Sequence, residues 1–280
     1  MSAFVYDSAN QRQIRRLLPD LIRARETLRD LIVKDFKARY RYTAMGFVWA
    51  ILQPLALMLI LTFIFTKVFS VRGELAANDY ASTVLCGLIF WQYFAASVNL
   101  ATHALVNNVD LIKKVYFTRE ILPIAAIVYP LTNLAIGMLV LLGVHLFRGG
   151  DFSLQLLWFL PVFGIQWVLV LGLALLLACG NVYYRDIAYV VEVALVFGFY
   201  ASPIFYELNQ VLDSDLGGVL RALYLLNPLA ELLTAYRQIL FEHRLPDFWL
   251  LAWPAMVAAC LAALGAVAFR RSAPTVSDYV

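Results

Sequence analysis

The stretch that decides the fold is Phe152-Ser-Leu-Gln-Leu-Leu-Trp-Phe-Leu-Pro-Val-Phe-Gly-Ile-Gln-Trp-Val-Leu-Val-Leu-Gly-Leu-Ala-Leu-Leu-Leu-Ala-Cys-Gly-Asn-Val-Tyr-Tyr184, which contains no Asp, Glu, Lys or Arg. About 20 apolar residues suffice for a helix to cross the hydrocarbon core of a bilayer. Four further stretches also lack these charged residues, and a sixth is interrupted only by Glu192: residues 42–66, 80–109, 121–147, 248–269 and 187–206. The sequence therefore predicts an all-α polytopic membrane protein with six transmembrane helices.

The composition agrees with a membrane protein. Hydrophobic residues make up 62% of the chain and charged residues 15%, whereas about a quarter of the residues in soluble domains are charged. Six spans leave too little of the 280 residues for a soluble catalytic domain of ordinary size. Cys86, Cys179 and Cys260 fall in three different predicted spans, so their spacing is typical of neither a disulfide nor a metal site.

The distribution of Lys and Arg predicts the orientation of the chain. Cytoplasmic flanks of membrane helices collect basic residues, and ten of the 22 precede the first predicted span. Six spans with both termini in the cytoplasm place 16 basic residues inside and 6 outside. A seventh crossing is disfavoured because it would move Arg270 and Arg271 outside. We therefore expect a cytoplasmic N-terminal segment over 1–41, a transmembrane domain over 42–269 with inner turns at 106–120 and 181–187, and a cytoplasmic tail over 270–280.

The N-terminal segment has a helical pattern of its own. Leu17, Leu21, Leu28, Leu31 and Ile32 recur at helical spacing, with basic residues between them. This pattern predicts an amphipathic helix that lies in the inner interface of the membrane. A simple positive anchor that sets the orientation of the first span fits the same residues equally well.

Residues 216–240 are apolar enough to suggest another span, yet they contain Arg221, Glu231 and the pair Asn227-Pro228. Asn-Pro inside such a run favours a break between two short helices. Non-helical backbone at membrane depth is tolerated only where it packs against protein or lines a watery cavity. We therefore expect a re-entrant helical hairpin on the outer side, between the fifth and sixth spans.

No catalytic motif is present in the sequence. The chain has no G-x-x-x-x-G-K-[ST] phosphate-binding loop, no H-E-x-x-H and no G-x-S-x-G. His103, His145 and His243 are scattered over three separate segments and are interpreted as ordinary polar residues. The sequence therefore predicts a protein that is not an enzyme and that binds neither metal nor cofactor.

The two inner turns combine aromatic, aliphatic and charged residues of both signs. A surface of this kind suits docking into a groove on a partner protein, although solvated turns between helices have a similar composition. The candidate docking residues are Asn108, Leu111, Lys113, Lys114, Tyr116, Phe117, Arg119, Tyr183, Tyr184, Arg185 and Asp186.

Two helical stripes mix aromatic and polar side chains within the predicted spans: Tyr42, Trp49 and Gln53 in the first, and Tyr189, Glu192 and Tyr200 in the fifth. An intramembrane carboxylate is costly and normally faces a cavity or a partner. We interpret the stripes as the lining of a pathway, while an interfacial aromatic belt explains part of the pattern. Rings with scattered hydrogen-bonding groups suit sugars, whose C–H faces lie on rings.

The sequence resembles the membrane subunits of type-2 ABC exporters for polysaccharides, the family that exports O-antigen, capsule and teichoic acid. The resemblance runs along nearly the whole chain. It is most specific at Lys37-Ala-Arg-Tyr-Arg-Tyr-Thr-Ala-Met-Gly-Phe-Val-Trp-Ala-Ile-Leu-Gln-Pro-Leu55, residues 107–123, Asn181-Val-Tyr-Tyr-Arg-Asp-Ile187, Ser202-Pro-Ile-Phe-Tyr206 and Asn227-Pro228. One departure is Thr118, where the family usually has Pro before the Arg-Glu pair.

The resemblance implies a homodimer in the bacterial inner membrane, with the translocation channel between the protomers. Two copies of a separate ABC ATPase would dock on the inner turns and hold the ATP and magnesium. The cargo would be an undecaprenyl-diphosphate-linked glycan. The resemblance makes Tyr42, Trp49, Tyr189 and Tyr200 candidate channel aromatics and places cargo entry near the basic N-terminal interface. The full set of predicted channel residues is Tyr42, Trp49, Gln53, Tyr189, Glu192, Tyr200, Phe205 and Tyr206, and the predicted lipid-headgroup entry is formed by Arg25, Arg29, Lys37, Arg39 and Arg41.

Three other functions can be weighed against this one. A type-2 ABC permease for a small drug or lipid remains open on sequence alone. A membrane glycosyltransferase would require acidic metal-binding motifs on loops, and none is visible in the sequence. An ion-coupled secondary transporter usually shows an internal repeat and helices interrupted at the midplane. Here no convincing repeat is present, and Glu192 is the only candidate coupling group.

Overall fold

The computed structural model describes residues 25–40, 48–64, 77–114, 118–147, 154–208, 211, 217–242 and 244–272, and these residues form helices, turns and bends without a strand. The helices are α2 (Arg25–Tyr40), α3 (Val48–Phe63), α4 (Ala77–His103), η3 (Val106–Asn108), α5 (Val109–Lys114), α6 (Ile121–Val128), α7 (Leu131–Phe147), η4 (Leu154–Trp158), α8 (Phe159–Tyr183), α9 (Asp186–Ala201), α11 (Gly218–Leu225), α12 (Pro228–Leu240) and α13 (Phe248–Ser272). Tyr42, Arg41, Tyr116 and Phe117 lie outside the described residues, as do the side chains of Arg25, Lys37, Arg39 and Lys114.

Four helical segments are long and apolar enough to cross a membrane. They are Tyr80–His103, Ile121–Leu146, Leu154–Tyr183 and Phe248–Ser272, with lengths of 24 to 30 residues. A helix needs only about 20 residues to span the hydrocarbon core. The chain is therefore a multi-pass, all-helical membrane protein, as the uncharged stretches predicted.

The remaining two predicted spans correspond to shorter helices. α9 has 16 residues, and the described part of α3 also has 16, which gives a length of about 24 Å at 1.5 Å per residue. The hydrocarbon core is about 30 Å thick, so α9 and the described part of α3 are each shorter than the core. The total of six spans and the cytoplasmic position of both termini stay predictions.

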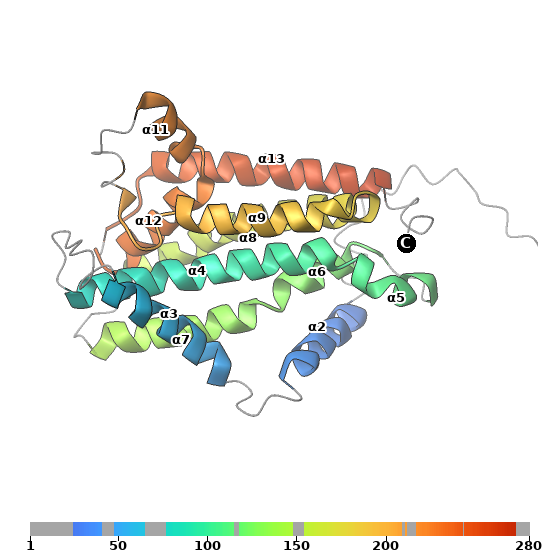
Figure 1. Cartoon of the computed structure of the whole chain (residues 1–280), viewed down its shortest axis with the longest axis horizontal. Coiled ribbons are helices and arrows are strands. Elements are labelled where there is room, and N and C mark those ends of the chain that lie inside the picture. The colour runs from blue at the N-terminus through green and yellow to red at the C-terminus, as the bar shows by residue number, and fades with distance from the viewer. Residues whose placement is uncertain are drawn as a thin grey trace, which may run out of the picture.

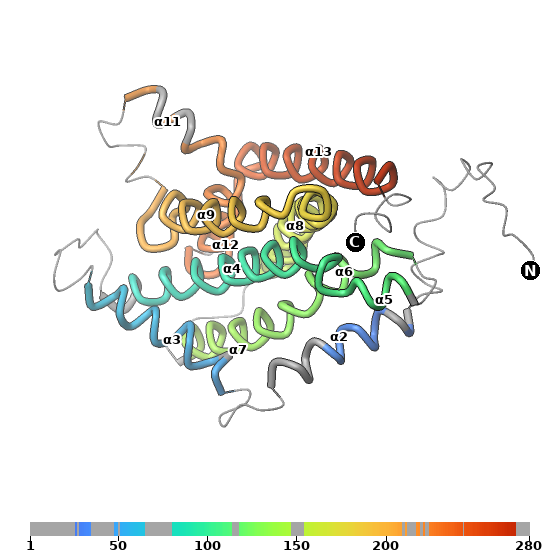
Figure 2. Tube along the Cα trace, turned by 45° about the vertical axis from the view of Figure 1, so that its right-hand side comes forward, coloured from blue at the N-terminus to red at the C-terminus, as the bar shows by residue number. Residues whose placement is uncertain are grey.

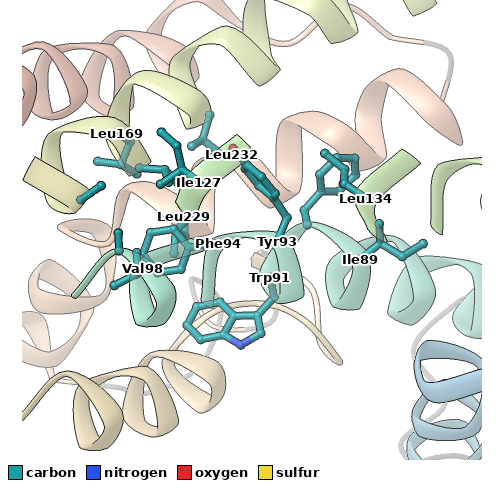
Figure 3. Close-up of a cluster of buried hydrophobic side chains, with 14 of the residues drawn as sticks. Ile89, Trp91, Tyr93, Phe94, Val98, Ile127, Leu134, Leu169, Leu229 and Leu232 are labelled. Atoms are coloured by element: carbon teal, nitrogen blue, oxygen red, sulfur yellow. The ribbon is translucent and has the colours of Figure 1, made fainter. Parts of the chain in front are cut away.

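α4 forms the centre of the bundle. It contacts α3, α6, α7, α8, α9 and α12, and Figure 1 shows it running through the middle of the molecule. Its buried side chains, including Trp91, Tyr93, Phe94 and Val98, point toward several neighbouring helices (Figure 3). Most of α4 is therefore buried against other helices.

The third predicted span is divided into α6 and α7 at Tyr129 and Pro130. Proline has no backbone N–H and cannot donate to the carbonyl four residues earlier, so it bends or breaks a helix. The helical pattern continues across the break, because Tyr129 N donates to Ala125 O at 3.1 Å and Leu134 N to Pro130 O at 3.1 Å. The segment therefore remains one span with a break inside it.

α13 packs mainly against α8, at a close crossing of two glycines. A Cβ atom added to Gly172 would lie 2.5 Å from Ala262 N, and one added to Gly265 would lie 2.6 Å from Gly172 O. Small residues allow two membrane helices to approach in this way. The opposite side of α13 exposes Met256 and Leu264, which is the composition of a surface that faces lipid.

A buried polar contact joins α12 to α4 and α8. Tyr236 on α12 donates its hydroxyl to Gln166 Oε1 at 2.7 Å, and Gln166 Nε2 donates to Phe90 O at 3.1 Å. The rings of Tyr236 and Phe90 stack with centroids 3.7 Å apart. Because buried polar groups require partners, this set of contacts fixes the position of α12 inside the bundle.

The segment predicted as a re-entrant hairpin contains α11 and α12, which are two short helices on either side of Asn227-Pro228. Asn227 has an extended backbone, and its side chain accepts a hydrogen bond from Leu229 N at 3.0 Å. Asn at the N-cap followed by Pro at the first helical position is a strong start signal for a helix. The depth of the two helices relative to the membrane stays a prediction.

Candidate functional site

The two predicted inner turns lie at one end of the helix bundle, which we call the inner end. Figures 1 and 2 both show α5 and the turn between α8 and α9 at this end, with α11 at the opposite, outer end. Asn181 at the end of α8 donates its Nδ2 to Thr102 O near the end of α4 at 3.0 Å. This bond connects the two helices that lead into the two turns.

The second inner turn projects from the bundle. α8 ends at Tyr183, and Tyr184 has an extended backbone with φ −132° and ψ 100°. The chain therefore reverses at once into α9, which begins at Asp186. Tyr184 is 72% exposed, and Arg185 and Asp186 are exposed as well. An aromatic ring and both charge signs are thus available to a partner at the same turn.

The first inner turn forms η3 and α5. Lys113 is exposed, and Asn108, Leu111 and Arg119 are half-buried. Every candidate docking side chain that the structure describes is therefore at least partly accessible at the inner end of the bundle. Docking itself stays a prediction.

Helix α2 is attached to the first inner turn. Lys34 Nζ donates to Asn108 Oδ1 at 2.9 Å, and Asn108 Nδ2 donates to Ala104 O at 2.8 Å. Sequence reasoning treated Lys34 only as one of many basic residues before the first span. No sequence pattern identifies this contact, because it joins two positions that are 74 residues apart.

α2 includes the described part of the predicted amphipathic helix. Leu31 is buried, Leu28 and Ile32 are half-buried, and the helix packs against α6. Its apolar side therefore faces the bundle. Arg29, one of the predicted headgroup residues, is exposed, so it remains available to lipid or cargo at the inner end.

The predicted pathway residues of α3 and α9 lie on the surface of the single chain. Trp49 is 51% exposed and Gln53 is exposed, both on α3. On α9, Tyr189 is 70% exposed, Tyr200 is 65% exposed and Glu192 is exposed. α4 contacts both helices and lies between them (Figure 1). Two stripes on the surface, on either side of α4, do not enclose a channel within one chain.

At the outer end the structure brings together three predicted residues and two that sequence reasoning missed. Their rings contact one another in sequence. The ring centroids of Tyr200 lie 5.3 Å from Phe199 and 6.2 Å from Phe205. The ring centroids of Tyr206 lie 5.1 Å from Phe205 and 6.3 Å from Tyr224. We call these five residues the outer aromatic cluster. Phe199 could have been found as the neighbour of Tyr200, whereas Tyr224 lies on α11 and gives no sequence signal.

The side chains of the inner turns and of the outer aromatic cluster are suited to binding other molecules. Among the described residues, no group of three or more His, Cys, Asp or Glu side chains is arranged to hold a metal ion. The outer aromatic cluster offers ring faces and Tyr hydroxyls, and the inner turns offer charges and an exposed ring. Such groups can bind, guide and hold other molecules.

Comparison with known proteins identifies the family. Residues 27–241 match the family described as ABC-2 type transporter. The chain is 32% identical over 232 residues to the O-antigen export system permease protein RfbA of Myxococcus xanthus, which covers 83% of this chain and 86% of that protein. It is 27% identical over 215 residues to a protein of the same name from Klebsiella pneumoniae, which covers 75% of this chain and 80% of that protein. The chain therefore belongs to the ABC-2 type transporter family and is a membrane permease subunit, which lacks the ATPase.

Proposed function

We propose that this chain is the permease subunit of an ATP-driven exporter that moves a lipid-linked polysaccharide, most specifically O-antigen, across the bacterial inner membrane. The observation that carries the proposal is the similarity over 83% of this chain to a protein named as an O-antigen export permease. The aromatic surfaces on α3, α9 and the outer aromatic cluster support it, because ring faces interact with the C–H faces of sugars.

The proposed assembly is a homodimer with six spans in each protomer and both termini in the cytoplasm. Support comes from Glu192, which is exposed on an otherwise apolar helix. A carboxylate facing lipid is costly, so a second copy of the chain would cover this surface. Of the residues of α9 only Val191 is buried, which leaves most of the helix available for such a contact. The stripes of two protomers would then face one common channel.

The energy would come from two copies of an ABC ATPase subunit, since ABC-2 permeases pair with such subunits. ATP and magnesium would be bound there, and the motion of the ATPase would reach the permease through the inner turns. Two contacts in this chain support that route. Asn181 connects the second turn to α4, and Lys34 connects α2 to the first turn. A shift of either turn would therefore be transmitted to helices that lead into the membrane.

The cargo would enter at the inner end, where α2 carries basic residues. A diphosphate headgroup is an anion that Arg binds well with its planar fork of donors, and Arg29 is exposed at this end. The glycan would follow the headgroup and pass along the rings of α3 and α9 toward the outer aromatic cluster. Each ring would hold a sugar briefly and release it to the next.

Deletion of the gene from its bacterium tests this proposal. We expect O-antigen to disappear from the cell surface while undecaprenyl-linked glycan accumulates on the cytoplasmic side, and we expect a plasmid copy of the gene to restore the surface polymer. Gel analysis of lipopolysaccharide and extraction of the lipid-linked glycan measure both quantities. If O-antigen is normal but capsule or teichoic acid is lost, the chain exports that other polymer. If all surface polymers are unchanged and the export of a drug or lipid is altered, a role in glycan export is contradicted.

A further inference from the structure

Segment 202–206, an irregular run of bends between α9 and α11, is held by side-chain donors from two other helices. Arg237 Nη2 donates to Ile204 O at 2.8 Å, and Arg237 Nη1 donates to Tyr206 O at 2.9 Å. Tyr80 on α4 donates its hydroxyl to the intervening carbonyl, Phe205 O, at 2.6 Å. These three consecutive backbone carbonyls lie outside a regular helix, and each accepts a hydrogen bond from a side chain instead.

Arg237 itself is deeply placed on α12, with only 6% of its surface exposed. Its Nη2 also donates to Thr83 O on α4 at 3.4 Å. Among the described residues, all of its hydrogen-bond acceptors are backbone carbonyls. A buried cation is costly unless it is well hydrogen-bonded. This guanidinium therefore connects α12, α4 and segment 202–206 at one point.

The neighbourhood of Arg237 leaves little room for the segment to move. A Cβ atom on Gly87 of α4 would lie 3.0 Å from both Cα and O of Ile204, and 3.1 Å from Arg237 Nη2. At the start of the segment, Asn227 Nδ2 donates to Ser202 Oγ at 2.9 Å and to Ala201 O at 3.2 Å. Gly87 allows α4 to lie close to Ile204. The side chains of Arg237 and Asn227 then hold segment 202–206 in this position.

We propose that Arg237 is a positioning residue for the outer end of the translocation pathway. Phe205 and Tyr206 belong to the held segment, and through their rings they fix the outer aromatic cluster with Tyr200 and Tyr224. The inference rests on the proposed function for its effect on export, because the cluster matters to transport only if cargo passes it. The geometric part, that Arg237 orders segment 202–206, is independent of the cargo.

The first test measures hydrogen–deuterium exchange in the permease–ATPase complex in nanodiscs. Arg237→Lys keeps the charge, but a single ammonium cannot reproduce the fork that bridges Ile204 and Tyr206. We expect amide exchange in residues 201–208 to rise about tenfold, with α8 and α2 unchanged, because local opening is confined to the released segment. The control is Arg221→Gln on α11, which is exposed and should leave exchange in this segment unchanged.

A second variant disturbs the same contact without changing Arg237 itself. Gly87→Ala places a methyl group against Ile204 and the guanidinium, so we expect the same local rise in exchange as in Arg237→Lys. Unchanged exchange in 201–208 for both variants would overturn the proposal. An equal rise through α4, α8 and 201–208 would also overturn it, since Arg237 would then support the fold as a whole.

Export in cells separates this inference from the proposed function. For both variants we expect glycan export to slow about threefold to tenfold while the ATP hydrolysis of the complex is retained, because the inner turns lie at the opposite end. Normal export despite a mobile segment would contradict the positioning role. If the unmodified complex moves no glycan at all, the proposed function fails, whereas the exchange result still decides whether Arg237 orders the segment.

Discussion

Charge reversal at the second inner turn is expected to uncouple ATP hydrolysis from export. In Arg185→Glu or Asp186→Lys, a docked partner would meet a charge of the wrong sign at an exposed position beside Tyr184. Like charges brought together in an interface cost several kcal/mol, and each 1.4 kcal/mol is a factor of ten. We therefore expect export to fall at least about thirtyfold in a reconstituted complex with the ATPase, measured together with the amount of ATPase that copurifies.

The matched controls for this experiment lie at the other end of the molecule. Arg244→Glu and Asp247→Lys reverse exposed charges between α12 and α13, where the proposed assembly has no ATPase, and they should leave export unchanged. Variants must also remain folded, which size-exclusion chromatography of the purified permease checks. If both inner-turn variants export at the normal rate with a normal amount of bound ATPase, Arg185 and Asp186 do not belong to the docking surface.

Removal of the rings from the two stripes is expected to slow export without disturbing membrane insertion. Trp49 and Tyr200 are exposed on α3 and α9, so neither Trp49→Ala nor Tyr200→Ala leaves a cavity in the core. An aromatic contact contributes about 0.5–1.5 kcal/mol beyond its buried area, which corresponds to a slowing of roughly threefold to tenfold for each ring. The measurement is the rate at which lipid-linked glycan reaches the outer side in proteoliposomes that also contain the ATPase.

Two comparisons separate a pathway from a lipid-facing belt. Trp249→Ala and Phe248→Ala remove rings that are 82% and 76% exposed at the start of α13, away from the stripes, and they should leave the rate unchanged. Tyr200→Phe keeps the ring and should retain most of the rate. If all four alanine variants slow export equally, the rings act as membrane anchors, and the lining role is wrong.

The membrane-spanning part of the fold was predictable because absence of charge is visible directly in the sequence. Each of the four long apolar segments corresponds to a stretch without Asp, Glu, Lys or Arg over most of its length. The same criterion does not measure helix length, so it did not show that α9 has only 16 residues. It also did not show the break at Pro130, since hydropathy is insensitive to the loss of one backbone hydrogen bond.

The contacts that connect distant segments were not predictable from local pattern. By charge alone, Arg237 is one of the six basic residues expected on the outer side, whereas the structure buries it against the carbonyls of segment 202–206. A buried Arg and an exposed Arg look the same in a charge count. The sequence could therefore indicate exposed candidates such as Arg185 and Trp49, whose roles stay predictions, but not the tertiary contacts that hold Tyr206 and Asn108 in place.

This chain is a permease without an ATPase of its own, and a separate ATPase subunit would drive it. The most direct measurement compares the purified chain alone with the chain plus its ATPase, in proteoliposomes loaded with undecaprenyl-linked glycan. We predict that the chain alone hydrolyses no ATP and moves no glycan, and that addition of the ATPase starts both. ATP hydrolysis or glycan movement by the chain alone would contradict the account.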